Sequence, residues 1–418
     1  MFKNVDELII FIESQKRNES KISLDYFRNI CNIYGNPQNK KKLIHIGGTN
    51  GKGSTVSFIQ NILINAGYNV GTYISPYIIC FNERITYNKE YISNEELLRV
   101  GNYIYSKYPE IESRGLRTPS FFEFMTLMSF IYFSEIKELD YAIIEVGIGG
   151  LLDTTNVINP IASAITNVSL DHENVLGNTL GQIWDNKLGI VKKDVPFFTI
   201  KNNDYKEKVI DKCNQVGASL KLVNREDVTN IKITTEYTEF DYLDFPAIRL
   251  QMLGAHQIEN AILALEICRG IKGINLSKEN IYRGIKSTFW PGRLEIVSKN
   301  PLIIIDGSHN VGGITALSEF IEVIKKQHKV RLIFAVSANK NKEAMIALFE
   351  PHVDEIIFTH FMYKRSDESL NLYNLSKHVN KTINDNIDEI VELTKKPNEY
   401  LNIYCGSLYF ISEIRNKF

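Results

Sequence analysis

The stretch "HIGGTNGKGSTVSFI", residues 45–59, contains the signals of a strand, a glycine-rich loop and a helix. The apolar residues at its start predict a buried strand, and the apolar spacing within residues 54–66 predicts a helix. Glycines let backbone N–H groups turn toward a phosphate, and the helix N-terminus adds partial positive charge. Lys52 would neutralise the β and γ phosphate oxygens, and Ser54 or Thr55 would reach Mg²⁺. The stretch therefore predicts a nucleotide-binding loop in an α/β domain.

The loop departs from the pattern G-x-x-x-x-G-K-[ST]. Ile46 stands where the first glycine belongs, and Gly53 separates Lys52 from the two hydroxyls. The alternative is a glycine-rich turn that joins a strand to a helix and binds nothing. By itself the loop indicates a nucleotide and leaves the reaction open.

Length, composition and charge exclude several classes of protein. A chain of 418 residues is longer than one hydrophobic core usually supports, so we expect two domains. A formal net charge of −1 gives no electrostatic basis for binding nucleic acid or an anionic membrane. No apolar run reaches the roughly 18 residues of a membrane span. Five scattered cysteines without C-x-x-C and no signal-peptide pattern predict a cytoplasmic protein with free thiols.

Short apolar runs alternate with helical patterns through most of the chain, which predicts an α/β fold with a largely parallel sheet. Segment 219–253 is rich in Thr, Tyr, Val and Ile without a helical period, so we expect antiparallel strands at a sheet edge. The expected strands are 42–46, 69–74, 140–146, 161–167, 195–200, 302–306, 330–336, 355–359 and 401–404. The expected helices are 54–66, 94–107, 121–136, 256–269, 312–327 and 341–350.

A domain boundary is expected where Trp290, Pro291 and Gly292 interrupt the pattern, because α/β alternation restarts at Pro301. The N-terminal domain, 1–292, is expected to be a P-loop-type, mostly parallel sheet with a small antiparallel edge subdomain. The C-terminal domain, 297–418, is expected to be a smaller Rossmann-like α/β unit, with 290–296 as the interdomain linker.

Polar side chains follow several of the predicted strands. Glu145 ends an apolar strand and runs into a glycine-rich turn, which is where a P-loop protein keeps its metal-ordering carboxylate. Asp171 and His172 follow the next strand, and Lys187 lies on a helix after them. Ligands bind beyond the carboxyl ends of strands in open α/β sheets. Taken singly, these side chains could instead be solvated surface charges or a satisfied histidine.

The second half of the chain repeats this arrangement. Asn260 lies in the first turns of a helix, where it could also be only a cap. Asp306 ends a buried strand, His309 lies in the turn after it, and Ser407 follows the last strand. Two units with polar strand ends predict a reaction completed between domains, with closure excluding water.

A set of motifs resembles the folylpolyglutamate synthase and dihydrofolate synthase family, the folate branch of the Mur-type amide ligases. The resemblance runs from about residue 24 to the C-terminus and implies ATP-dependent amide ligation. ATP would phosphorylate a pteroate or folate carboxylate, and the amino group of glutamate would attack the acyl phosphate. The motifs are GNPQ (35–38), GTNGKGST (48–55), SPY–NERI (75–85), EVGIGGLLDTTN (145–156), LDH–LG–T (170–179), NKLGIVK (186–192), LGAHQIENA (253–261), WPGRLE (290–295), DGSHN (306–310) and GSLY (406–409).

The resemblance implies a role for each matching residue. Lys52, Lys187, His309 and Ser407 would be catalytic, with the last two near the incoming glutamate. The residues that would contact ATP are Gly48, Thr49, Asn50, Gly51, Lys52, Gly53, Ser54, Thr55, Asn260, Arg293 and Asp306. Ser75, Glu145 and His172 match ligands of magnesium, with two ions expected, and Lys187 matches a lysine that is carbamylated. The folate or pterin contacts would be Arg84, Phe121, Phe122, Glu123, Leu152, Asp153 and Thr154.

Departures from the family pattern bear on substrate choice. Leu151 stands where the family usually has Arg, at the border of the expected pterin loop. The other departures are Tyr77, Asn186, Val311, Asn339 and Asn341, and none of them removes an expected phosphate or metal ligand.

The leading hypothesis is a monomeric ligase whose partners are small molecules, namely ATP, L-glutamate and folate or dihydropteroate. Two alternatives stay open: a Mur-type ligase for a non-folate carboxylate, and a paralogue that binds nucleotide without turnover. A P-loop motor or switch would give no reason for the polar strand ends of the second unit. The sequence does not separate dihydrofolate synthase from polyglutamylating activity.

Overall fold

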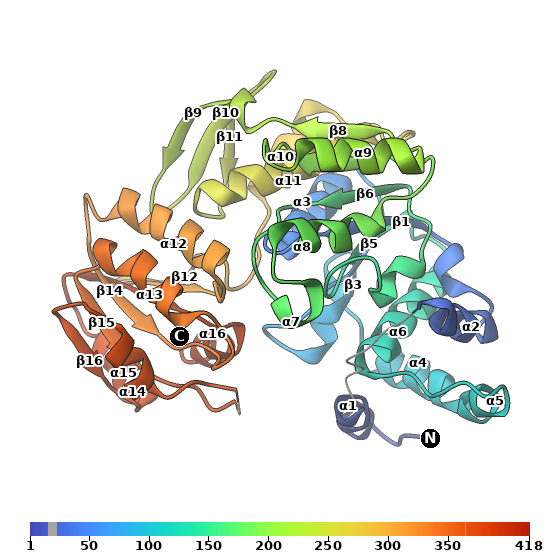
Figure 1. The fold of residues 1–418 in the computed structure, drawn as a ribbon, viewed down its shortest axis with the longest axis horizontal. Coiled ribbons are helices and arrows are strands. Elements are labelled where there is room, and N and C mark those ends of the chain that lie inside the picture. Colours follow the sequence, from blue (N-terminus) through green and yellow to red (C-terminus); the bar gives the residue numbers. More distant parts are fainter. Residues whose placement is uncertain (16–22, 364) are drawn as a thin grey trace. The chain divides into compact units, whose positions relative to one another are not determined.

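The computed structural model describes residues 1–15, 23–363 and 365–418 of the chain. It contains two compact units, which are drawn in Figure 1. Unit 1 comprises Met1–Val168, His172–Arg225 and Asn260–Ile285, and unit 2 comprises Ser169–Asp171, Glu226–Glu259 and Lys286–Phe418. The domain limits 1–292 and 297–418 remain predictions of the sequence.

Unit 1 is built on a mostly parallel sheet with the strand order β4-β3-β2-β5-β1-β6-β7-β8. β1 is central and pairs in parallel with β5 and β6, and an antiparallel pairing of β2 with β3 begins one edge. The strands are β1 (Lys42–Gly47), β2 (Val70–Tyr73), β3 (Ile85–Tyr87), β4 (Glu90–Tyr91), β5 (Tyr141–Glu145), β6 (Ala162–Ile165), β7 (Phe197–Ile200) and β8 (Leu220–Val223).

Helices bury the apolar faces of this sheet. α3 packs against β1, β2 and β5, and its buried apolar side chains include Val56, Ile59 and Ile62. On the opposite face of the sheet, a second apolar cluster contains residues of α1, α2, α4 and α6 together with strand residues such as Leu43 and Ile144. The helices are α1 (Val5–Ser14), α2 (Asp25–Ile33), α3 (Lys52–Asn65), α4 (Asn94–Ser106), α5 (Tyr108–Ser113), α6 (Phe121–Glu135), α7 (Glu173–Leu176), α8 (Leu180–Lys187) and α9 (Lys206–Val216), with α10 (Ala255–Gly270) from Asn260 onward and α11 (Lys278–Lys286) up to Ile285.

Unit 2 contains a second sheet with the order β12-β13-β17-β14-β15-β16. Successive side chains of a strand point to opposite faces. Ile304 therefore packs in one cluster with residues of α12 and α13, while Ile303 and Ile305 pack in another with residues of α15 and α16. The strands are β12 (Glu295–Lys299), β13 (Leu302–Asp306), β14 (Lys329–Phe334), β15 (Glu355–Phe358), β16 (Lys381–Ile383) and β17 (Tyr400–Cys405). The helices are α12 (Val311–Ile324), α13 (Lys342–Phe349), α14 (Ser369–Leu375), α15 (Ile387–Lys395) and α16 (Leu408–Arg415).

The expected fold class is confirmed, with one correction in segment 219–253. Antiparallel strands are present there, as β9 (Val228–Ile233), β10 (Thr238–Tyr242) and β11 (Phe245–Leu250), but they form a sheet of their own. The prediction is wrong for its first residues, because β8 pairs in parallel with β7 in the large sheet. A four-residue strand has no periodicity long enough to distinguish the two pairings.

The nine remaining expected strand ranges and the six expected helices all coincide with elements of the structure. Within the described part of the chain, no helix combines the length and the apolar character needed to cross a membrane.

Candidate active site

The loop between β1 and α3 is held by hydrogen bonds to the residues that follow β6. Gly48 has a φ of 142°, and a Cβ atom at this position would overlap the hydroxyl of Thr166, so glycine is required. Thr166 Oγ1 donates to the carbonyl oxygen of Asn50 at 2.5 Å, and the backbone N–H of Thr49 donates to Asn167 O at 2.8 Å. β1 and β6 are neighbours in the sheet, so Thr166 and Asn167, which follow β6, lie beside the loop that follows β1.

The first turn of α3 presents backbone N–H groups toward the loop. Gly51 is the N-cap residue at a φ of 81°, and no side chain caps the helix. A Cβ atom at Gly51 would overlap the amide oxygen of Asn260, which also lies 3.5 Å from Thr55 Oγ1. The first N–H groups of an α-helix have no partner within the helix, and their dipoles attract an anion. The turn therefore suits a phosphate, with Asn260 beside it.

Two lysine side chains meet at one backbone oxygen of this loop. Lys52 Nζ donates to Gly48 O at 3.2 Å and to Thr49 O at 3.0 Å. Lys187 Nζ, at the end of α8, donates to Gly48 O at 2.8 Å. Lys187 is only 3% exposed, so its charge is largely removed from water. Together the two groups make the loop an electropositive site that fits phosphate oxygens.

Two expected metal ligands lie together at the ends of adjacent strands. β2 and β5 are paired, and the backbone N–H of Ser75 donates to Glu145 Oε2 at 3.3 Å. Glu145 is buried, and an ionised carboxylate offers two acceptor oxygens. A carboxylate and a serine hydroxyl are oxygen ligands of the kind that Mg²⁺ prefers, so this pair fits the ion.

The third expected ligand, His172, is exposed and is the N-cap residue of α7, with a φ of 53°. Across residues 1–15, 23–363 and 365–418, no group of three or more His, Cys, Asp or Glu side chains forms a metal-binding cluster. The structure thus brings Ser75 and Glu145 together, and the assignment of His172 to the metal remains a prediction.

The glycine-rich turn after β5 is organised by Asp153. Its Oδ2 accepts the backbone N–H of Ile148 at 3.0 Å. Its Oδ1 accepts both the N–H of Thr155 at 3.0 Å and the Thr155 hydroxyl at 2.6 Å. Thr154 is buried beside it and Leu152 is half-buried. Asp153 therefore closes the loop 148–153 on itself.

Two further expected folate contacts lie at the start of α6. Glu123 is buried; it receives two hydrogen bonds from the guanidinium of Arg117, at 2.7 and 2.8 Å, and caps the helix through Ser120. The Phe122 ring would overlap a Cβ atom at Gly147, so it packs directly on the loop after β5.

Arg84 lies among aromatic rings. Its guanidinium carbon is 5.0 Å from the ring centroid of Tyr77, 5.8 Å from that of Phe81 and 5.2 Å from that of Phe121. Such cation–π contacts hold a guanidinium in one orientation. The expected folate residues Arg84 and Phe121 are therefore in contact with each other.

The expected residues of unit 2 also lie at neighbouring strand ends, since β13 and β17 are paired. Asp306 accepts the N–H of Leu294 at 2.8 Å, beside Arg293, and the N–H of Ser308 at 2.9 Å. Ser407 is buried at the start of α16.

His309 is neutral at pH 7. Burial and the ammonium of Lys340 lower its pKa to about 4, and Asp171 opposes this effect only in part. Its Nδ1 lies 2.8 Å from the carbonyl oxygen of Gly307, which can only accept. The ring proton is therefore on Nδ1, and Nε2 carries a lone pair that can accept a hydrogen bond.

The chain matches the Mur ligase middle domain over residues 46–268 and the Mur ligase glutamate ligase domain over residues 292–401. It is 32% identical to the dihydrofolate synthase/folylpolyglutamate synthase of Bacillus subtilis (strain 168), with 100% of each chain covered. The chain belongs to the folylpolyglutamate synthase and dihydrofolate synthase family. The family resemblance expected from the sequence is confirmed.

Solved structures of the family share this fold. The crystal structure of a folylpolyglutamate synthase from Thermotoga maritima is 31% identical, covers 99% of this chain and 96% of its own, and has a TM-score of 0.84. A folylpolyglutamate synthase complex with AMPPCP and folate is 27% identical, covers 99% of each chain and has a TM-score of 0.83. The expected class of ATP-dependent ligase is confirmed by these relatives.

Sequence reasoning missed a polar network beside His309 that this family's motifs contain. Asp171 accepts Lys340 Nζ at 2.6 Å and Asn310 Nδ2 at 2.8 Å, and its Oδ2 lies 3.9 Å from His309 Nε2. Asp171 and Lys340 are 169 positions apart, which explains why spacing alone could not pair them. The signal was present, since both residues lie in the motif segments LDH and Asn339-Lys340-Asn341.

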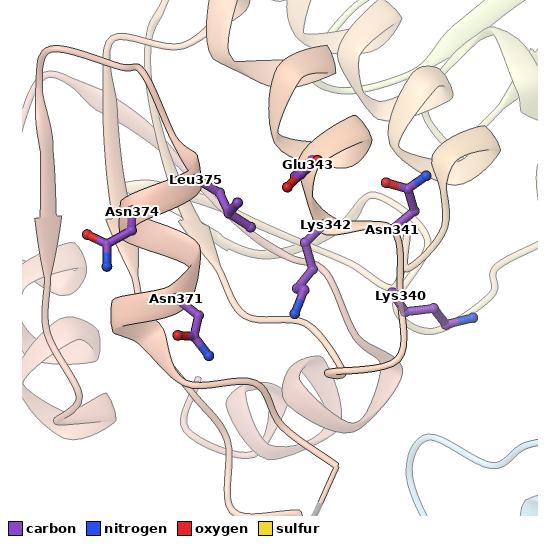
Figure 2. A pocket seen from close by; sticks show the side chains of 7 residues that line it. All are labelled: Lys340, Asn341, Lys342, Glu343, Asn371, Asn374 and Leu375. Atoms are coloured by element: carbon purple, nitrogen blue, oxygen red, sulfur yellow. The ribbon is translucent and has the colours of Figure 1, made fainter.

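A surface pocket of unit 2 borders this network (Figure 2). Its volume is about 470 Å³. The two lysines that line it form ion pairs, Lys340 with Asp171 and Lys342 with Asp367. None of the expected site residues lines it. The lining residues are Lys340, Asn341, Lys342, Glu343, Asn371, Asn374 and Leu375.

Proposed function

We propose that the protein joins L-glutamate to the carboxylate of a folate, of dihydropteroate, or of both, at the site described above. The observation that carries this proposal is the convergence of Lys52 and Lys187 on Gly48 O, in a loop whose neighbouring strands deliver Ser75 and Glu145. A loop with a lysine at the start of its helix, beside a carboxylate that can hold a metal ion, is the arrangement that phosphoryl transfer needs.

The first step transfers a phosphoryl group. The loop Gly48–Thr55 and Asn260 hold the triphosphate, and Lys52 offsets the charge on its β and γ oxygens. An oxygen of the substrate carboxylate attacks the γ phosphorus, ADP leaves, and an acyl phosphate forms. A carboxylate alone is a poor acyl donor because oxide would be its leaving group, and phosphorylation removes this obstacle. Catalysis rests on positioning and on charge neutralisation.

Ser75 and Glu145 would hold Mg²⁺, and His172 would add a further ligand at one of two ions. When bound, the ion neutralises charge on the phosphate oxygens. Lys187 would be carbamylated: its neutral amine adds to carbon dioxide and loses a proton, which leaves an anionic carbamate. Its burial supports this assignment, as does its place beside Gly48 O, which Lys52 Nζ also contacts, since an anionic carbamate there would offset the charge of the Lys52 ammonium.

The second step is attack by the amino group of glutamate. The amine adds to the acyl carbon, and the tetrahedral intermediate expels inorganic phosphate to leave an amide. His309 Nε2 is unprotonated and can accept a hydrogen bond from the attacking amine, while the Ser407 hydroxyl can donate to a glutamate carboxylate. Arg293 and Asp306 would contact ATP, the guanidinium by neutralising phosphate charge.

The folate would lie against the loop after β5. Phe121, Phe122 and Arg84 offer aromatic and cationic surface, and Leu152, Asp153 and Thr154 offer loop contacts. The Asp153 and Glu123 carboxylates already accept internal hydrogen bonds, so each has limited acceptor capacity left for a pterin.

We further expect a cytoplasmic monomer that binds neither nucleic acid nor membrane.

Purified protein incubated with ATP, Mg²⁺, glutamate and either dihydropteroate or tetrahydrofolate tests the proposal. We expect a product heavier by one glutamyl residue and one phosphate released per product. Leu151, within the loop 148–153, is 51% exposed and departs from the Arg of the family pattern, and this favours one alternative, a ligase for a non-folate carboxylate. If phosphate is released with another carboxylate but with neither dihydropteroate nor tetrahydrofolate, that alternative is supported and the folate assignment is overturned.

A further inference from the structure

A buried histidine lies beneath the nucleotide loop and takes no part in the proposed chemistry. His45 is in the middle of β1, paired in register with Ile144 of β5 and Ser163 of β6, and it is fully buried. Strand alternation places it on the same face as Leu43, whose apolar cluster includes residues of α6. Burying a polar ring in such a cluster costs free energy unless it is hydrogen-bonded.

The partner of this ring is Thr155, at the end of the segment 148–155, which we call the folate loop because the proposed function places the folate against it. His45 Nε2 is 2.8 Å from Thr155 Oγ1, and the two residues are 110 positions apart. Thr155 Oγ1 in turn lies 2.6 Å from Asp153 Oδ1. A hydroxyl has one proton to donate and a carboxylate oxygen can only accept, so the Thr155 proton points to Asp153. Thr155 must therefore accept from His45, and the ring proton is on Nε2.

The hydrogen bonds thus form a directed relay, from His45 through Thr155 to Asp153. Burial lowers the pKa of His45 to about 3, so the ring stays neutral and keeps this one donor. Its Nδ1 has no hydrogen-bond partner among the described residues. Asp153 Oδ2 also accepts a hydrogen bond from the N–H of Ile148 at 3.0 Å, so Asp153 links the relay to the backbone of the loop. One end of the relay is rigid sheet, and the other end is the loop expected to contact the pterin.

We propose that His45 is a positioning residue, whose Nε2–H fixes Thr155 and Asp153 and thereby holds the folate loop against the strand that leads into the nucleotide loop. This inference rests on the proposed function, because it assigns the loop to a folate or pteroate substrate. Buried hydrogen bonds between side chains restrict the groups that they join to one arrangement, whereas apolar packing tolerates several. By ordering the loop before the substrate binds, the relay would lower the free-energy cost of binding.

Steady-state kinetics of paired variants test the relay. His45→Leu and Thr155→Val remove one link each, and His45→Gln and Thr155→Ser keep a donor or a hydroxyl in place. We expect the first pair to raise KM for the pteroate substrate about tenfold, on the order of one lost buried hydrogen bond, while KM for ATP changes less than about twofold. The second pair should stay close to wild type. The double variant His45→Leu/Thr155→Val should be no worse than either single variant.

Ser163→Ala is the matched control, since Ser163 is buried on the adjacent strand and its hydroxyl has no hydrogen-bond partner within the described residues. It should alter neither KM. Equal increases in KM for ATP and pteroate, or a His45→Gln variant as impaired as His45→Leu, would overturn the positioning role. Additive effects in the double variant would do the same.

Amide hydrogen exchange separates failure of the relay from failure of the proposed function. The N–H groups of Ile148 and Thr155 both donate to Asp153, so His45→Leu should speed their exchange, and His45→Gln should not. This readout needs no substrate. If the wild type ligates no pteroate substrate yet the exchange pattern appears, the relay stands and the substrate assignment fails. Unchanged exchange at both amides in His45→Leu would refute the relay itself.

Discussion

The ammonium of Lys187 lies 2.8 Å from the carbonyl oxygen of Gly48, within the nucleotide loop. Lys52 Nζ reaches the same oxygen at 3.2 Å. Two cations beside one carbonyl repel each other, and the repulsion is stronger where water is excluded. A bound triphosphate would relieve it, and conversion of Lys187 to an anionic carbamate would relieve it further.

Lys187→Ala should abolish glutamate-dependent phosphate release, because the variant loses the carbamate that the proposal places beside the metal. Short carboxylates such as formate or acetate should restore part of the activity by occupying the vacated space. Lys208→Ala is the control, since Lys208 of α9 pairs on the surface, at 2.6 Å, with Asp185, which lies on the same helix as Lys187. An intact mass measured with bicarbonate present that shows unmodified Lys187 in fully active enzyme would contradict the carbamate.

Lys52→Ala and Glu145→Ala should each lower kcat by about 10²–10³-fold, since each removes preorganised charge from a phosphoryl-transfer site. Circular dichroism should show that both variants remain folded. Lys42→Ala, at the exposed start of β1, should behave as wild type. Turnover near that of the wild type in either site variant would refute the assignment.

Arg293→Ala should lower kcat by about 10²-fold with a smaller change in KM for ATP. We expect its guanidinium to contact phosphate charge mainly in the reacting complex, and such a contact raises turnover more than it tightens binding. The matched control in unit 2 is Arg249→Ala, whose guanidinium stacks on Tyr237 with its carbon 3.6 Å from the ring centroid. If KM for ATP rises while kcat is unchanged, Arg293 only binds the nucleotide.

The stability of the fold should depend on pH through His45. Its pKa is about 3 in the folded protein and about 6.5 in an unfolded chain, so between these values only the unfolded state binds the proton. The free energy of unfolding should therefore be highest above about pH 6.5 and fall as the pH is lowered toward 3. His45→Gln should lose this contribution, and its urea denaturation midpoints should fall less steeply over that range. Parallel pH curves for the two proteins would contradict a buried, neutral His45.

Strand ends could be predicted from the sequence, and side-chain partners across the fold could not. Glu145 and Asp306 end apolar runs, so their positions at the carboxyl ends of strands follow from the pattern of the strands themselves. His45 lies inside such a run, and the sequence gives no sign of its bond to Thr155 because the partner is 110 residues away. The pairing of β8 with β7 was missed because the strand spans only Leu220–Val223.

The transfer of oxygen from the substrate to phosphate tests the central claim most directly. Pteroate or folate substrate labelled with ¹⁸O in both carboxylate oxygens would be ligated to glutamate with ATP and Mg²⁺, and the released phosphate would be analysed by mass. If the carboxylate is phosphorylated and the amine expels that phosphate, each phosphate should carry one ¹⁸O atom and each amide should keep one. Phosphate without ¹⁸O alongside normal amide formation would contradict an acyl phosphate and, with it, the chemistry assigned to this site.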